Sequence, residues 1–336
     1  MKYFLTALVL ALGQTPAYSQ SPAAAAAPAS ADTPVSKPAK PAKPASKGPA
    51  PTLANVAYGS DARQVLDFWK ADTKSPAPVL FFIHGGGWNK GDKNSVLNNG
   101  CEAYLKSGIS VVSIHYRFVP AARAAGIKPP VLWPLSDAAR ALQLVRSKAR
   151  EWNLDKNRIA ASGGSAGACS SLWLAFHPDM ANPASPDLIA RESTRLTCAA
   201  VGGAQTTLDP QQMRDWTPNS NYGGHAFGFA ASPDKMSQFQ NFLAGRQAIL
   251  PWINEYSPYH LVTGDDPPVY LYYANPPAFG QEQKDPTHSA NFGVGLMEKL
   301  KAARVPCELQ YPGATGVRHR SIQDCVIARL GGIPQP

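Results

Sequence analysis

Short runs of apolar residues recur along the chain and are separated by segments with helical spacing. Six runs predict strands at residues 79–83, 109–114, 158–162, 197–201, 269–274 and 307–311. The runs are continuous rather than alternating, which indicates strands covered on both faces, as in a parallel sheet. Residues 55–70 instead alternate around a Gly-Ser-Asp turn, and this pattern predicts an antiparallel hairpin at the sheet edge.

The segments between the apolar runs favour helices. In residues 135–152 and 290–303, apolar side chains recur at steps of three and four along one face: Ala138, Leu142, Val145, Ala149 and Trp152, then Phe292, Leu296 and Leu300. Strand and helix therefore alternate, which predicts an α/β fold with a mostly parallel, doubly wound sheet.

One region breaks this alternation. Residues 204–268 contain no clear strand but many aromatic side chains. A structureless loop of this length is improbable in a compact domain, so we expect an inserted cap that contains some helix.

The chain begins with a segment typical of export. Residues 1–19 combine Lys2, a short apolar run and a cleavage site ending Ala-Tyr-Ser, which predicts a signal peptide. Residues 20–51 are rich in Ala, Pro and Lys and predict a disordered linker, so the folded domain should span 52–336. No other run reaches membrane-span length, and we expect a secreted or periplasmic protein without a membrane anchor.

Charge and cysteine content exclude several classes of function. The formal net charge is +9, of which Lys2 and the linker carry four, and no dense Lys/Arg run appears in the folded part. This argues against a nucleic-acid-binding protein. No C-x-x-C or H-E-x-x-H pattern suggests a metal site. The pairing of Cys101, Cys169, Cys198, Cys307 and Cys325 and the oligomeric state stay open.

The residues Gly163-Gly164-Ser165-Ala166-Gly167 form a G-x-S-x-G motif between a predicted strand and a predicted helix. That context is the one in which a nucleophilic serine occupies a sharp turn, with glycines where no side chain fits. Ser165 is therefore the candidate nucleophile, and it requires a base and an orienting acid.

Three histidines lie beyond the main part of the cap: His260, His288 and His319. In this fold the order along the chain is serine, acid, histidine, with the histidine after the last strand. His319 lies in the loop between the strand at 307–311 and the final helical segment, so we predict His319 as the base. Glu282 and Asp285 both follow the strand at 269–274 and are the candidate acids.

The stretch FFIHGGGWNKGD, residues 81–92, places three glycines directly after a predicted buried strand. Backbone N–H groups of Gly85 and Gly86, with that of Ala166, can stabilise the oxyanion of an acyl-transfer reaction by about 3–4 kcal/mol per donor. We expect His84 to hold this loop in shape by hydrogen bonding. Trp88 is a candidate wall of the substrate pocket, with simple core packing as the alternative.

Together, HGGGW and GGSAG resemble the α/β-hydrolase superfamily, and more narrowly its hormone-sensitive-lipase-like and acetyl-esterase-like carboxylesterases. HGGGWNKGDK is similar to the form found in bacterial feruloyl and acetyl-xylan esterases and in kynurenine formamidases. The segment HYRFVP at 115–120 and the helix with DAARAL at 137–142 are also similar to these families. The acid segment and the histidine loop depart from the usual family patterns.

The resemblance implies a serine carboxylesterase that hydrolyses short acyl esters of small molecules or polysaccharide without metal or cofactor, and the signal-like residues 1–19 imply its export. Counting back four turns from Leu300, the family's acid falls on Asp285 rather than Glu282. The implied triad is therefore Ser165, Asp285 and His319. Two alternatives stay open: an amidase or formamidase on the same fold, and a catalytically inactive binding protein.

Overall fold

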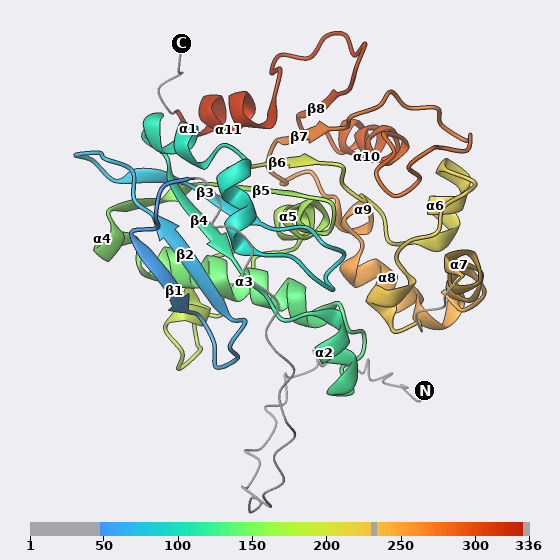
Figure 1. Cartoon of the computed structure of the whole chain (residues 1–336), viewed down its shortest axis with the longest axis horizontal. Helices are drawn as coiled ribbons and strands as arrows, with labels where there is room; N and C mark the ends of the chain where they lie inside the picture. Colours follow the sequence, from blue (N-terminus) through green and yellow to red (C-terminus); the bar gives the residue numbers. More distant parts are fainter. Residues whose placement is uncertain (1–47, 230–233, 332–336) are drawn as a thin grey trace, which may run out of the picture. The chain divides into compact units, whose positions relative to one another are not determined.

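The computed structural model describes residues 48–229 and 234–331 (Figure 1). The expected signal peptide and residues 20–47 of the expected linker lie outside these residues. Residues 48–51, which composition assigned to the linker, belong to the folded part instead. The carbonyl of Pro49 accepts a hydrogen bond of 2.9 Å from the indole of Trp69, the last residue of the strand Val65–Trp69.

Eight strands form one sheet in the order β1-β2-β4-β3-β5-β6-β7-β8. Their bounds are β1 Leu53–Ala57, β2 Val65–Trp69, β3 Ala77–Ile83, β4 Ser110–Ile114, β5 Leu154–Gly164, β6 Cys198–Gly202, β7 Val269–Tyr272 and β8 Cys307–Gln310. The pairs β1–β2 and β2–β4 are antiparallel, and the other neighbours are parallel. The mostly parallel sheet and its edge hairpin confirm the predicted fold class.

Helices follow most of the strands. They are α1 Cys101–Lys106, α2 Val119–Ala124, α3 Leu132–Ser147, α4 Ala149–Trp152, α5 Ala166–Phe176, α6 Pro210–Trp216, α7 Lys235–Ala244, α8 Leu250–Tyr256, α9 Pro258–Leu261, α10 Asn291–Ala302 and α11 Ile322–Leu330. Short 3₁₀ turns are η1 Lys93–Asn98, η2 Ile189–Arg191, η3 Gly224–Phe227 and η4 Arg246–Ile249. The helix expected over 135–152 is divided at Lys148, where α3 ends and α4 begins.

The two faces of the sheet bury separate cores, because side chains alternate along a strand. Phe81 and Ile83 of β3 belong to the core that also contains residues of α3, α5 and α10, whereas Leu80 and Phe82 belong to the core that contains residues of α1 and α11. Figure 1 shows α1 and α11 together on one side of the strands and α3 on the other.

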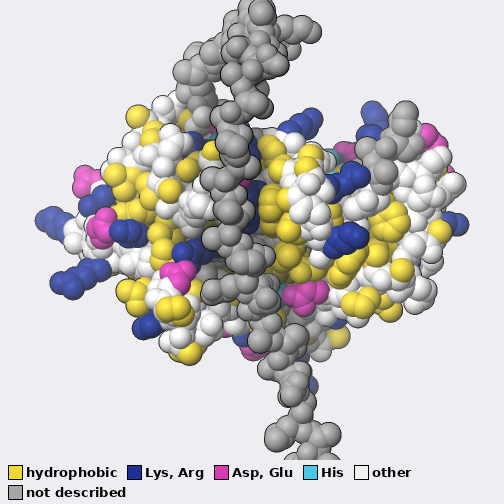
Figure 2. All heavy atoms as spheres, turned by 90° about the horizontal axis from the view of Figure 1, so that it is seen from below, with side chains coloured by type: hydrophobic (Ala, Val, Ile, Leu, Met, Phe, Trp, Pro, Cys, Tyr) yellow, Lys and Arg dark blue, Asp and Glu magenta, His cyan; other side chains and the backbone are white. Residues whose placement is uncertain are grey.

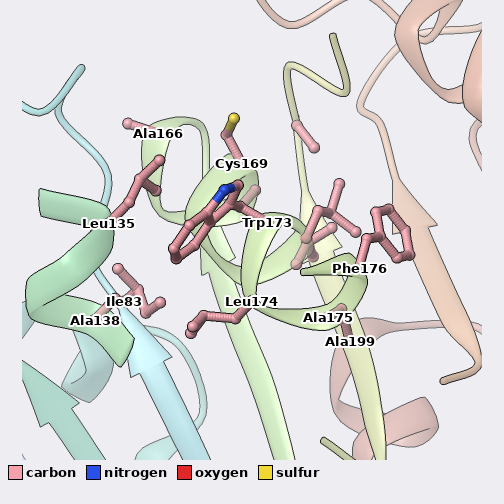
Figure 3. Packing of buried hydrophobic residues seen from close by; sticks show 14 of the residues in the cluster. Ile83, Leu135, Ala138, Ala166, Cys169, Trp173, Leu174, Ala175, Phe176 and Ala199 are labelled. Atoms are coloured by element: carbon pink, nitrogen blue, oxygen red, sulfur yellow. The ribbon is translucent and has the colours of Figure 1, made fainter. Parts of the chain in front are cut away.

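Helix α5 occupies the centre of the larger core, and every one of its residues is buried. Figure 3 shows Trp173 and Leu174 of α5 beside Leu135 and Ala138 of α3, with Ile83 drawn between Ala138 and Leu174. A helix that is apolar all round must be covered on all sides. Its first turn, which follows Ser165, is therefore held in place by the core.

The cap between β6 and β7 contains α6 to α9 and, in its described part, no strand, as the aromatic-rich segment predicted. Helix α9 packs on α5, and α6 packs on α10, so the cap is fixed to the sheet domain at both ends. Its buried aromatic side chains include Phe227, Phe239 and Phe242.

Other expectations concern the surface and the cysteines. In the described ranges no helix has the length and apolarity needed to cross a membrane, and no cluster of His, Cys, Asp and Glu could hold a metal ion. On the face shown in Figure 2, Lys and Arg side chains are scattered, with Asp and Glu among them. All five cysteines are free thiols, and four of them are buried.

Candidate active site

Ser165 lies in the sharp turn between β5 and α5, with φ 54° and ψ −123°. A positive φ at a residue with a side chain costs on the order of 1–3 kcal/mol, and the surrounding structure must impose it. A Cβ added to Gly163 would lie 2.3 Å from the carbonyl oxygen of Ile83, and a Cβ added to Gly167 would lie 2.0 Å from the same atom. Both distances are too short for a side chain to fit. The two glycines let the turn press directly against β3, and the Ser165 amide donates to Gly202 O at 3.0 Å.

The imidazole that reaches Ser165 belongs to His288. Its Nε2 lies 3.0 Å from Ser165 Oγ, and its Nδ1 lies 2.8 Å from Oδ2 of Asp285. Both residues lie in the loop between β7 and α10. A hydroxyl, an imidazole and a carboxylate thus form one continuous chain of hydrogen bonds, which is the arrangement that activates a serine.

The carboxylate of Asp285 is held by its own loop. Its Oδ1 accepts hydrogen bonds from the amides of Thr287 and His288, each 3.2 Å long. Burial alone would raise the pKa of the Asp285 carboxyl, but the hydrogen bond and charge of His288 and the two amides hold that pKa below its ordinary value. Asp285 is therefore a carboxylate at neutral pH.

The prediction that His319 lies at Ser165 is wrong. His319 is 8% exposed, and its Nδ1 lies 2.8 Å from Oε1 of Glu308 on β8. Oε2 of Glu308 accepts the amides of Arg318 and His319 at 2.9 and 3.0 Å. The side chain of Glu308 thus holds the imidazole of His319 against β8, and the histidine anchors the loop that precedes α11.

Asp285 was predicted as the acid, and it does hold an imidazole, but that of His288 rather than that of His319. The signal that sequence reasoning passed over is the spacing Asp285-Pro286-Thr287-His288. Because the aspartate can accept the amides two and three residues later, this turn brings carboxylate and imidazole together without any other element. Glu282 lies outside this chain of hydrogen bonds.

The glycine loop after β3 lies against the serine turn. A Cβ on Gly85 would meet Gly164 O at 2.6 Å and Ser165 Cβ at 3.5 Å, so the backbone of Gly85 is next to the nucleophile. Gly86 has φ 110°, and its carbonyl accepts the amides of Asn89 and Lys90. No acceptor for the amides of Gly85, Gly86 or Ala166 is present among the described residues. These N–H groups can therefore bind an oxyanion.

His84 supports this loop as expected. Its Nδ1 lies 2.8 Å from Gly85 O, and its ring stacks on Tyr116 at 4.3 Å. The hydroxyl of Tyr116 donates to His84 O at 2.8 Å. Burial lowers the pKa of His84 to about 4. The ring is therefore neutral at pH 7, and Nδ1 donates to the carbonyl.

Trp88 does not line the cavity that opens beside Asp285 and His288. The second interpretation of Trp88, simple core packing, is therefore the one that applies. Trp88 is completely buried, and its indole donates to Ser170 Oγ on α5 at 2.9 Å. Two cap residues that carry no recognisable motif approach the same loop. His225 Nε2 lies 2.9 Å from Gly87 O, and the ring of Tyr222 lies 5.0 Å from that of His225.

A cavity of about 590 Å³ opens beside Asp285 and His288. Its walls come from the ends of β5, β6 and β7, from α1 and from the loop that leads into α11. They are lined by Phe82, Asn99, Tyr104, Ser162, Gly163, Gly164, Gly202, Gly203, Tyr272, Ala274, Asn275, Asp285, His288, Arg320, Ser321, Ile322 and Gln323. This volume is in the range of small-molecule sites.

Comparison with known proteins relates the chain to a family and to several hydrolases. Residues 66–276, more than half of the chain, match the family described as BD-FAE. The probable carboxylic ester hydrolase LipM of Mycobacterium tuberculosis is 33% identical over 131 residues, or 37% of this chain and 28% of that protein. Phenmedipham hydrolase of Pseudarthrobacter oxydans is 35% identical over 115 residues, or 34% of this chain and 23% of that protein.

The matched segments thus span about a quarter of these relatives' lengths. Among solved structures, a truncated carbohydrate esterase from gut microbiota superposes with a TM-score of 0.62 at 18% identity, over 85% of this chain and 99% of that one. At that level of identity the similarity establishes the α/β-hydrolase fold.

Proposed function

Because the chain belongs to the BD-FAE family, we propose that it is a serine carboxylesterase in which Ser165, His288 and Asp285 form the catalytic triad. The observation that carries this proposal is the continuous hydrogen-bonded chain from Ser165 Oγ through His288 to Asp285. The esterase and hydrolase names of the relatives support the same activity.

In the proposed reaction, Ser165 Oγ attacks the ester carbonyl while Nε2 of His288 takes the hydroxyl proton. The carbonyl oxygen becomes an oxyanion and accepts hydrogen bonds from the amides of Gly85, Gly86 and Ala166. His288 then gives its proton to the departing alkoxide, and an acyl-serine remains. Asp285 keeps Nδ1 protonated in the free enzyme and stabilises the imidazolium.

Hydrolysis of the acyl-serine reverses these roles. His288 takes a proton from water, the resulting hydroxide adds to the acyl carbonyl, and the proton returns to Ser165 Oγ as the carboxylic acid leaves. No step needs a metal or a cofactor, because the charge that develops is met by backbone amides and the imidazolium.

We further propose short acyl esters, C2 to C4, as substrates, carried by small alcohols or polysaccharide. The segment HGGGWNKGDK, with its resemblance to esterases of plant polysaccharide, supports this range. The signal-like residues 1–19 support a secreted or periplasmic protein. N-terminal sequencing of the exported protein would reveal cleavage after Ser19 or its absence.

The decisive experiment compares two histidine variants with 4-nitrophenyl acetate as substrate. His288→Gln should reduce turnover at least about 10³-fold, as loss of a triad base does. His319→Gln is the matched control, because it also removes an imidazole from a C-terminal loop, and it should reduce turnover far less. The reverse ranking would refute the proposed base.

Ser165→Ala and fluorophosphonate labelling separate the remaining alternatives. A live serine hydrolase labels at Ser165, whereas an inactive binding protein does not. If Ser165 labels but formyl amides are cleaved faster than 4-nitrophenyl acetate, the activity is that of an amidase on the same fold.

A further inference from the structure

The cavity beside His288 contains one cationic side chain whose role the triad does not explain. Arg320 is the only Lys or Arg among the residues that line it. Within residues 48–229 and 234–331, no carboxylate lies within ion-pair distance of Arg320 and no hydrogen bond from its guanidinium is present. The exposed guanidinium lines the same cavity as His288 and is therefore available to a ligand.

Two carboxylates, one in the cavity lining and one that holds the preceding loop, are engaged by other partners. Asp285, the one carboxylate among the residues that line the cavity, accepts hydrogen bonds from the ring of His288 and from two amides. Glu308 accepts from His319 and the amides at 318 and 319, and it lies 4.0 Å from Arg329. Neither carboxylate needs Arg320 as a partner.

The backbone on both sides of Arg320 is fixed. His319 is buried and bonded to Glu308, and Ser321 caps α11 by accepting the amide of Asp324 at 3.1 Å. The arginine is thus presented from a rigid turn rather than from a free loop, which lowers the entropic cost of binding. Ile322 and Gln323, also in the lining, begin α11, whose amino end adds a positive partial charge.

The remaining lining combines apolar surface with hydrogen-bonding side chains. Tyr272 presents an aromatic ring that is 39% exposed, and Asn275 and Gln323 supply amide side chains with donors and acceptors. Guanidinium, with its planar fork of donors, matches a carboxylate better than any neutral group. The cavity therefore combines a carboxylate receptor with hydrogen-bonding walls beside the ester-cleaving groups.

We propose that this cavity binds a carboxylate carried by the substrate, in addition to the scissile ester, and that Arg320 is the residue that selects it. The proposal rests on the esterase function proposed above. It gives His319 and Glu308 a part in that selection, because they hold the turn from which Arg320 extends.

Two pairs of substrates test the proposal and locate the carboxylate. The acyl pair is 4-nitrophenyl hydrogen glutarate against 4-nitrophenyl butyrate. The alcohol pair is acetylated methyl glucuronoside against acetylated methyl glucoside. In one of the two pairs, wild-type protein should cleave the carboxylate-bearing substrate with a kcat/KM at least fivefold higher than that of its neutral partner. The pair that shows this preference identifies whether the acyl side or the alcohol side of the ester occupies the cavity.

Arg320→Gln should reduce this ratio at least fivefold, mainly through KM. The matched control is Arg318→Gln, which removes an equal charge from the same turn at a side chain outside the lining, and it should leave the ratio within twofold. Equal losses in both variants, or no preference for the carboxylate in either pair, would overturn the proposal.

If wild-type protein cleaves none of these esters, the esterase function fails, and binding then decides the inference separately. Calorimetric titration of the full chain with glutarate and with glucuronate should detect saturable binding that Arg320→Gln weakens at least fivefold and Arg318→Gln does not. Absence of such binding would count against the carboxylate site itself.

Discussion

Nδ1 of His288 lies 2.8 Å from Oδ2 of Asp285, and the two residues are three positions apart in one loop. The acid and the base of the proposed triad therefore do not come from the ends of two different strands. One turn sets their relative geometry, and only the distance to Ser165 depends on the packing of the domain.

This relationship predicts the effect of replacing the carboxylate. Asp285→Asn should lower kcat by about 10²–10⁴-fold, because an amide stabilises the imidazolium poorly and favours the wrong tautomer of His288. The melting temperature should change little, since the Asp285 side chain is 53% exposed. Glu282→Gln, in the same loop, is the control and should stay within a few-fold of wild type. A mild Asp285→Asn variant would mean that another acid orients His288.

Several features of this site could be predicted from local sequence, and others could not. The parallel strands follow from continuous apolar runs, and the serine turn follows from a motif whose glycines have no room for a side chain. The choice of Asp285 over Glu282 depends on the resemblance, which implies an acid about four turns before Leu300. The base was missed because His288 and His319 both lie in loops after late strands, and only tertiary packing decides which loop passes over β5.

The cap and Trp88 illustrate a second limit. Trp88 follows the glycine loop in the sequence, but its positive φ of 56° turns the indole into the core rather than toward the cavity. His225 and Tyr222 approach the loop from a segment without any motif. Contacts of this kind depend on how a long insertion folds back, which no local pattern encodes.

A second prediction concerns the glycines of the serine turn. Gly167→Ala should destabilise the fold by about 3 kcal/mol or more, because its Cβ would lie 2.0 Å from Ile83 O, a backbone atom of a central strand. Gly164→Ala is the matched control for stability, since the nearest atom to its Cβ is 3.9 Å away. Urea denaturation of both variants measures the difference. Equal stability would show that the turn is not pressed against β3.

The pair of Glu308 and His319 predicts a pH-dependent contribution to stability. Burial would raise the pKa of Glu308, but the amide and ring of His319 lower it below its ordinary value. Glu308→Gln should cost about 1–3 kcal/mol at pH 7, where the carboxylate accepts these bonds. That cost should be fully present above the unfolded pKa of about 4.3 and should shrink as the pH falls through the lowered folded value. If Glu308→Gln lowers the stability by the same amount at every pH, the ionised carboxylate of Glu308 is not what stabilises the fold.

His84 predicts a change of stability in a different pH window. Its pKa in the folded protein is about 4, lowered by burial from 6.5, so the unfolded chain binds a proton more readily. Stability should therefore fall by about 2–3 kcal/mol as the pH decreases from 6.5 to 4. His84→Asn, which can still donate to Gly85 O, should be less stable at pH 7 but show a shallower slope. Parallel slopes for the two proteins would show that other groups dominate this window.

The last prediction concerns the start of the folded domain. The buried indole of Trp69 donates to Pro49 O, and Thr52 Oγ1 accepts the amide of Lys70 at 2.9 Å. Composition alone predicted that a chain starting at Thr52 would be complete. Such a chain retains the second bond but leaves the Trp69 indole without its acceptor, and it should lose about 1–2 kcal/mol of stability. A chain starting at Gly48 should match the mature protein in melting temperature.

Trp69→Phe provides the internal control, because it removes the indole N–H in both chains and should make their stabilities nearly equal. The difference in stability between the two truncated chains could also be as large with Trp69→Phe as with the tryptophan. In that case the hydrogen bond to Pro49 is not its cause, and other contacts of residues 48–51 stabilise the domain.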